Sequence, residues 1–190
     1  MENNIRDYRT LRSGVGLIKT SVLLLLIAVV VAICSAMLLF TPLSFVGAGM
    51  GLMACYGLLI LGGLCALIGK ILCLKAPVAK QLVAGSLAMD ALAVVLASTD
   101  HSTITSAIML LSFGLFMGFF FLLGDHLKDL SICDSVRSVI KNYAICLALG
   151  LVASLTGFGI LGLVGLIFAL ISFLSYLSVL SMTSRALNCA

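Results

Sequence analysis

Charged residues are scarce in this chain. Only 9% of its 190 residues are Asp, Glu, Lys or Arg, whereas 63% are apolar, and the mean hydropathy is +1.31. A soluble domain carries about 25% charged residues, because its surface must face water. The scarcity therefore excludes an ordinary soluble domain, a disordered chain and a nucleic-acid-binding protein built on basic patches. What remains is a protein embedded in a lipid bilayer.

Patterns for metal, redox and catalytic sites are missing as well. The only two histidines, His101 and His126, bracket one predicted span and so are expected on opposite membrane faces. The seven cysteines form no Cys-x-x-Cys pair. The chain also lacks His-Glu-x-x-His, Gly-x-Ser-x-Gly and the phosphate-binding Gly-x-x-x-x-Gly-Lys-Ser/Thr pattern. We therefore expect no metal site, no cofactor and no enzymatic activity.

Two long charge-free runs predict helices that fold back across the membrane. The run between Lys19 and Lys70 would form a single helix of about 75 Å, whereas the hydrocarbon core is about 30 Å thick. Pro42 disfavours helix at the residue before it and divides this run. The run between Lys141 and Arg185 is divided at the segment 156–159. The sequence predicts one all-α bundle of six transmembrane helices, at residues 17–40, 45–73, 81–98, 104–123, 139–156 and 160–181.

The basic residues predict how this bundle is oriented. All eleven lie before or at the start of the first span, after the last, or in and next to the connections that follow the second and fourth spans. The other three connections contain no Lys or Arg. The positive-inside rule therefore places both termini in the cytoplasm, in a multi-pass protein of the cell (inner or plasma) membrane. The net charge of +4 indicates attraction to anionic lipid headgroups, and no nucleic-acid partner is expected.

Two segments are predicted to lie on the cytoplasmic membrane surface. Apolar residues recur at helical spacing in residues 1–16, with arginines elsewhere on the helical wheel. Residues 125–142, which overlap the start of the fifth span, likewise have one apolar and one charged face. Both patterns are typical of interfacial amphipathic helices.

Asp90 is the only acidic or basic residue near the middle of a predicted span. A charge at a helix centre costs about 2.5–3.5 kcal/mol on insertion. The free energy of inserting the third span on its own is therefore close to zero. Its face of small residues, including Ser86, lets a neighbouring helix approach and bury Asp90. No basic residue is expected at this depth, because Lys19 and Lys70 lie toward the cytoplasmic ends, so Tyr56 is the predicted hydrogen-bond donor. Asp90, Tyr56 and Ser86 therefore form either a polar anchor or an ion or proton site.

Small residues at three- and four-residue spacing predict close packing of the second, fourth and sixth spans. Such residues let helix backbones approach in lipid, where association depends on van der Waals contact. The seams serve packing within the bundle or association between copies. Their glycines are Gly47, Gly51, Gly62, Gly69, Gly114, Gly118, Gly162 and Gly165.

The junction Gly69-Lys70-Ile71-Leu72-Cys73-Leu74-Lys75-Ala76-Pro77 resembles one in uncharacterised bacterial multi-pass inner-membrane proteins. The resemblance covers less than a tenth of the chain, and that group has no assigned chemistry. Two functions follow from the residues themselves. The first is a structural or accessory protein that packs with itself or with a membrane complex. The alternative is a small transporter or channel for an ion or small solute that uses Asp90.

Overall fold

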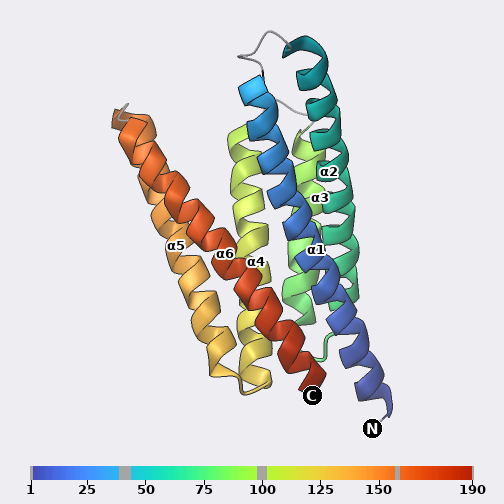
Figure 1. The fold of residues 1–190 in the computed structure, drawn as a ribbon. Helices are drawn as coiled ribbons and strands as arrows, with labels where there is room; N and C mark the ends of the chain where they lie inside the picture. Colours follow the sequence, from blue (N-terminus) through green and yellow to red (C-terminus); the bar gives the residue numbers. More distant parts are fainter. Residues whose placement is uncertain (1, 39–43, 98–101, 157–158, 190) are drawn as a thin grey trace.

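The computed structural model describes residues 2–38, 44–97, 102–156 and 159–189. In these ranges the chain forms six helices and no strand. Five of the helices, all except α3, contain segments long and apolar enough to cross a membrane among the described residues. The predicted all-helical membrane bundle is confirmed at this level. The helices are α1 (Glu2–Leu38), α2 (Ser44–Cys73), α3 (Lys80–Ala97), α4 (Ser102–His126), α5 (Leu130–Thr156) and α6 (Gly159–Cys189) (Figure 1).

Each helix packs most extensively against its neighbour in sequence, which gives three antiparallel pairs: α1 with α2, α3 with α4, and α5 with α6. Helix α4 also contacts α5, and α1 contacts α6, so the pairs join into one bundle. Helix α1 begins and α6 ends at the same end of this bundle (Figure 1). From that end the α5–α6 pair diverges from the other four helices (Figure 1).

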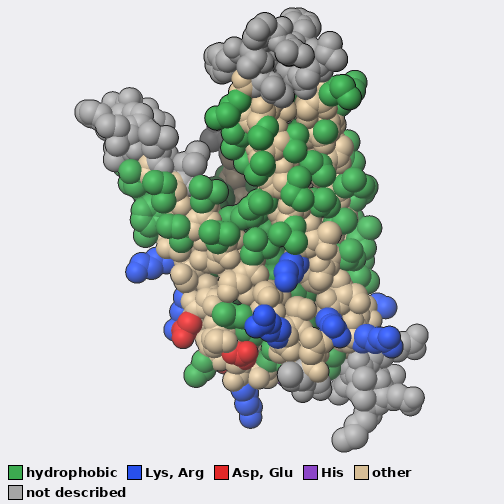
Figure 2. Space-filling view, in the orientation of Figure 1, with side chains coloured by type: hydrophobic (Ala, Val, Ile, Leu, Met, Phe, Trp, Pro, Cys, Tyr) green, Lys and Arg blue, Asp and Glu red, His purple; other side chains and the backbone are tan. Residues whose placement is uncertain are grey.

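The two ends of the bundle differ in surface chemistry. Lys and Arg side chains gather on the half where α1 begins, here called the charged end, and hydrophobic side chains cover the other half (Figure 2). Long exposed apolar side chains begin at Leu23 in the described part of α1 and cease after Leu174 in that of α6. Such a band has the chemistry of a lipid-facing surface.

The core is densest at the charged end. Phe119 and Phe120 of α4 are fully buried there, with their ring centroids 5.4 Å apart. The same core contains Leu11, Val15, Leu123, Ile132, Val136 and Leu187, from four helices. The hydroxyl of Tyr8 and Nε2 of His126 lie 3.3 Å apart and link α1 to the end of α4. The helices thus converge at this end around an interior like that of a soluble bundle.

This core includes residues of the two segments that were predicted to lie on the membrane surface. Residues 2–38 are one continuous helix, so the N-terminal segment is an extension of the first predicted span. Residues 130–156 are likewise continuous, and only a short turn with a positive φ of 55° at Lys128 separates α4 from α5. Leu11 and Val15 in the first segment and Val136 in the second are fully buried against protein, whereas Leu130 and Ile140 are exposed. Neighbouring helices therefore cover part of both amphipathic faces.

Candidate functional site

Four side chains from three helices form a polar cluster around Asp90. Nζ of Lys70 in α2 donates to Asp90 Oδ2 in α3 at 2.5 Å and to Ser86 Oγ at 2.8 Å. The hydroxyl of Ser112 in α4 is within hydrogen-bond reach of both Asp90 Oδ1 and the Ser86 carbonyl oxygen, the latter at 3.0 Å. The hydroxyl oxygens of Ser86 and Ser112 also lie 3.0 Å apart. We call Lys70, Ser86, Asp90 and Ser112 the polar cluster.

The polar cluster is partly buried. Ser86 and Ser112 are 0% and 2% exposed, whereas the side chains of Lys70 and Asp90 are 14% and 37% exposed. The Lys70 ammonium also lies 5.0 Å from the centroid of the Phe116 ring, within the range of a cation–π interaction. The contact surface predicted for α3 is present, since Val83, Ser86 and Ala93 are all buried.

Lys70 corrects the prediction that no basic residue reaches the depth of Asp90. Side chains on a helix tilt toward its N-terminus. Because α2 and α3 run in opposite directions, the Lys70 side chain leans away from the charged end and Asp90 leans toward it. The backbone positions of the two residues do not show that their side chains lean toward each other. Tyr56, the predicted donor, is 66% exposed on α2, and the carboxylate is bound by Lys70 and Ser112 instead.

The arrangement favours a charge-neutral contact that joins helices. Both carboxylate oxygens of Asp90 have partners, and no described buried side-chain nitrogen or oxygen lacks one. Among the described residues, no group of three or more His, Cys, Asp or Glu side chains lies close enough together to hold a metal ion. The cluster therefore joins α2, α3 and α4 through hydrogen bonds and one ion pair.

Most of the glycines of the predicted seams lie at contacts inside the bundle. A Cβ atom on Gly51 or Gly62 would meet Ser35 or Ser21 of α1, and one on Gly69 would lie 2.8 Å from the carbonyl oxygen of Gly14. Gly118 faces Leu82 of α3, and Gly165 faces Leu149 of α5. Gly47 and Gly162 lie in α2 and α6, in parts of these helices where the structure describes the backbone and not the side-chain surroundings. Gly14, the partner of Gly69, was not among the glycines expected at a seam.

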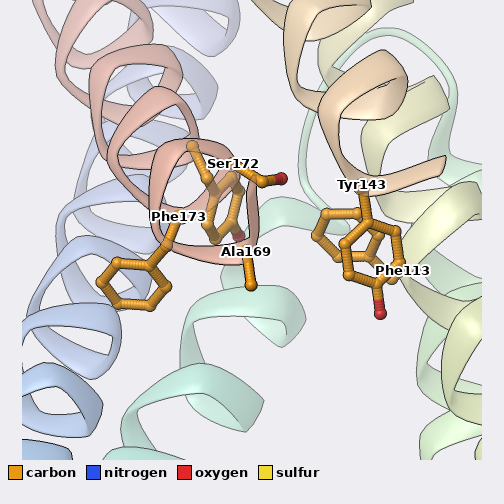
Figure 3. A pocket seen from close by; sticks show the side chains of 6 residues that line it. Phe113, Tyr143, Ala169, Ser172 and Phe173 are labelled. Atoms are coloured by element: carbon orange, nitrogen blue, oxygen red, sulfur yellow. The ribbon is translucent and has the colours of Figure 1, made fainter. Parts of the chain in front are cut away.

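Gly114 is the exception, because a Cβ atom there would meet nothing within 4 Å. It lines a cavity of about 170 Å³ between α4 and α5, together with Leu110, Phe113, Ile140, Tyr143, Ala144 and Leu147. A second cavity of about 120 Å³, which also includes Phe113 and Tyr143, is closed by residues of α6. In Figure 3, Phe113 and Tyr143 lie on one side of that cavity and Ala169, Ser172 and Phe173 on the other.

An aromatic pair separates the two cavities. The rings of Phe113 and Tyr143 have centroids 4.8 Å apart, and Phe113 also meets the edge of Tyr176 at 6.0 Å. The hydroxyl of Ser172 donates to the carbonyl oxygen of Val139 at 3.3 Å. No charged side chain lines either cavity, so both are suited to neutral, apolar groups.

No family model, curated protein or solved structure matches this chain.

Proposed function

We propose that this protein is a structural or accessory helix bundle of the cell membrane that packs with a second copy or with a membrane complex. The observation that carries the proposal is the internal use of Asp90. Its two oxygens bind Lys70 and Ser112. Asp90, the one acid near the middle of a predicted span, thus holds α3 against α2 and α4. An acid that carries an ion across the membrane would instead need to release its protein partner and bind water or the ion.

The proposed orientation has six crossings, with both termini in the cytoplasm. The gathering of Lys and Arg at one end of the bundle supports it, because cytoplasmic flanks of membrane proteins are enriched in these residues. Helix α3 would be the sixth crossing. Asp90 lies close to the exposed Leu92 and Val94, so the carboxylate would lie within the hydrocarbon and require the ammonium of Lys70.

The outer face of α2 is the proposed packing surface. Its residues at alternating three- and four-residue spacing are all exposed: Met50, Met53, Gly57, Ile60, Leu64, Leu67 and Ile71. In the described part of the chain the backbone of α2 packs against α1 and α3, and Lys70 reaches α4 on the inner side, so the outer face remains open. A Cβ atom on Gly57 would meet nothing within 4 Å, which leaves room for the backbone of a partner helix.

The direct test is purification in mild detergent, with the mass of the particle and any retained proteins measured for the wild type and for Gly57→Leu. We expect the wild type to be larger than one chain plus detergent, and Gly57→Leu to shift toward the monomer because the leucine blocks close approach. Gly150→Leu is the matched control, since Gly150 also faces open space, on α5. Equal particle mass in all three, with no retained protein, would contradict the proposal.

Reconstitution into liposomes tests the alternative of a transporter. We expect no cation or proton flux above that of empty liposomes. Flux that is lost in Asp90→Asn but kept in Lys75→Met, a variant of an exposed lysine in the same junction, would replace this proposal with a transport function.

A further inference from the structure

The larger cavity is part of a groove that runs along α4 and α5. On α5, Ile140, Ala144 and Leu147 follow at three- and four-residue spacing and share one face, and on α4 the facing residues are Leu110 and Gly114. We call these five residues the α4–α5 groove. Gly114, Ala144 and Leu147 are exposed, so the groove opens sideways from the bundle.

A cation lies beyond the groove on the side of the charged end. Arg137 lies one helical turn before Ile140, and its guanidinium carbon lies 5.5 Å from the centroid of the Phe121 ring in α4. Its side chain is 70% exposed, and its ionic partner, Asp134, is 75% exposed and lies 3.6 Å away. An ion pair this open is weak, so the guanidinium remains available to a stronger anion. Lys141, also exposed, follows one turn later on the same side of α5.

The dimensions of the groove match one leaflet of a bilayer. From Arg137 to Leu147 the helix rises by about 15 Å, which is half of a hydrocarbon core of about 30 Å. One end of this path is cationic and amphipathic, and the remainder is apolar and bordered by small residues. A membrane phospholipid has this same division, with a phosphate at one end and an acyl chain of about this length.

We propose that the α4–α5 groove binds an anionic phospholipid, with its phosphate against Arg137 and Lys141 and one acyl chain between α4 and α5. The proposal rests on the proposed orientation for its leaflet, which is the cytoplasmic one. Arg is well suited to phosphate, because its planar guanidinium donates two parallel hydrogen bonds. The lipid chain would fill the space that Gly114 leaves open, and so join the diverging α5–α6 pair to α4.

The test is native mass spectrometry of the detergent-purified full chain after addition of dioleoyl phosphatidylglycerol or dioleoyl phosphatidylcholine. We expect the wild type to retain phosphatidylglycerol with about thirtyfold preference, since Arg137 and Lys141 near an anionic headgroup each contribute on the order of 1 kcal/mol. Arg137→Gln should lower that preference about fivefold, because Lys141 remains, while the acyl chain is still bound. Arg185→Gln, which changes an exposed cation on α6, should leave the preference unchanged.

Gly114→Leu tests the acyl-chain part of the proposal. A Cβ atom at this position meets nothing within 4 Å, so we expect the variant to fold, to fill part of the cavity and to retain about fivefold less of either lipid. Ala144→Leu provides a second filling variant, and Gly63→Leu, at an open position on α2, is the control.

Three results would overturn the proposal. They are equal lipid retention by Gly114→Leu, Ala144→Leu and the wild type; an unchanged lipid preference in Arg137→Gln; and displacement of the lipid by excess inorganic phosphate, which would show that only a phosphate ion is recognised. Failure here leaves the proposed packing function intact, because that function is measured by particle mass and flux on a different face.

Discussion

Helix α4 packs against its neighbours in two contrasting ways, and two consecutive residues mark the division. Ser112 faces α3, where it joins the polar cluster and is 2% exposed. Phe113 faces α5 and α6, where it meets two tyrosine rings and borders both cavities. The polar side is closed and saturated with hydrogen bonds, whereas the aromatic side is open and incompletely filled.

The difference shows that these two contacts respond to opposite perturbations. Removing a group from the polar side leaves a charge or hydroxyl without a partner in a region of low dielectric, which is costly. Adding atoms on the aromatic side fills space that is already there and costs little. The predictions below compare matched positions on these sides, beginning with the largest effect.

The largest loss is expected from truncating a ring in the closed core. Phe120→Ala should lower the free energy of unfolding by about 3–5 kcal/mol, because the ring is fully buried. Phe113→Ala should cost about 1–2 kcal/mol, since that ring already borders cavities and loses mainly its aromatic contacts. Unfolding in detergent titrated with SDS measures both. Equal losses would mean that the two sides are packed alike.

Lys70→Met should cost about 2–3 kcal/mol, because it leaves the Asp90 carboxylate without its cation. Asp90→Asn should cost less, since the long Lys70 side chain can turn toward the charged end. The double variant Lys70→Met with Asp90→Asn should recover part of the loss, because no unpaired charge remains. Lys75→Met is the control, and a double variant as unstable as the two losses summed would argue against direct pairing.

Gly69→Ala and Gly114→Ala make the same chemical change at a closed and an open position. Gly69→Ala should cost about 1–2 kcal/mol, because its Cβ atom would lie 2.8 Å from the backbone oxygen of Gly14. Gly114→Ala should stay within about 0.5 kcal/mol of the wild type. The same SDS titration distinguishes them, and a Gly114→Ala variant as unstable as Gly69→Ala would show that its cavity is closed in the membrane.

The sequence predicts the ends of the helices accurately at the end of the bundle opposite the charged end, and less accurately at the charged end. The predicted boundaries at residues 45 and 156 agree within one residue with the start of α2 at Ser44 and the end of α5 at Thr156, because the sequence has Pro42 and Gly157 next to them. At the charged end, hydropathy identifies where lipid contact stops, but α1 and α6 continue past that point because other helices bury their apolar faces. Composition alone does not reveal that other helices bury these apolar faces.

The candidate site was predicted in part for a similar reason. Asp90 and Ser86 were found because a charge in an apolar span is conspicuous and its helix face is made of small residues. Lys70 was placed too far away, since its depth was judged from the backbone and not from the reach and tilt of the side chain. Ser112 carries no signal that separates it from other serines, and the cavities depend on the divergence of α5 and α6, which no single segment encodes.

The unbroken course of α1 has a mechanical consequence. Residues 2–38 form one continuous helix, so a displacement of its first turns would be passed to the turns that follow. A movement of the turns before Leu11 would therefore pivot about the tight backbone contact between Gly14 and Gly69. Because Lys70 follows Gly69 directly, such a movement would first change the distance between Lys70 and Asp90 in their ion pair.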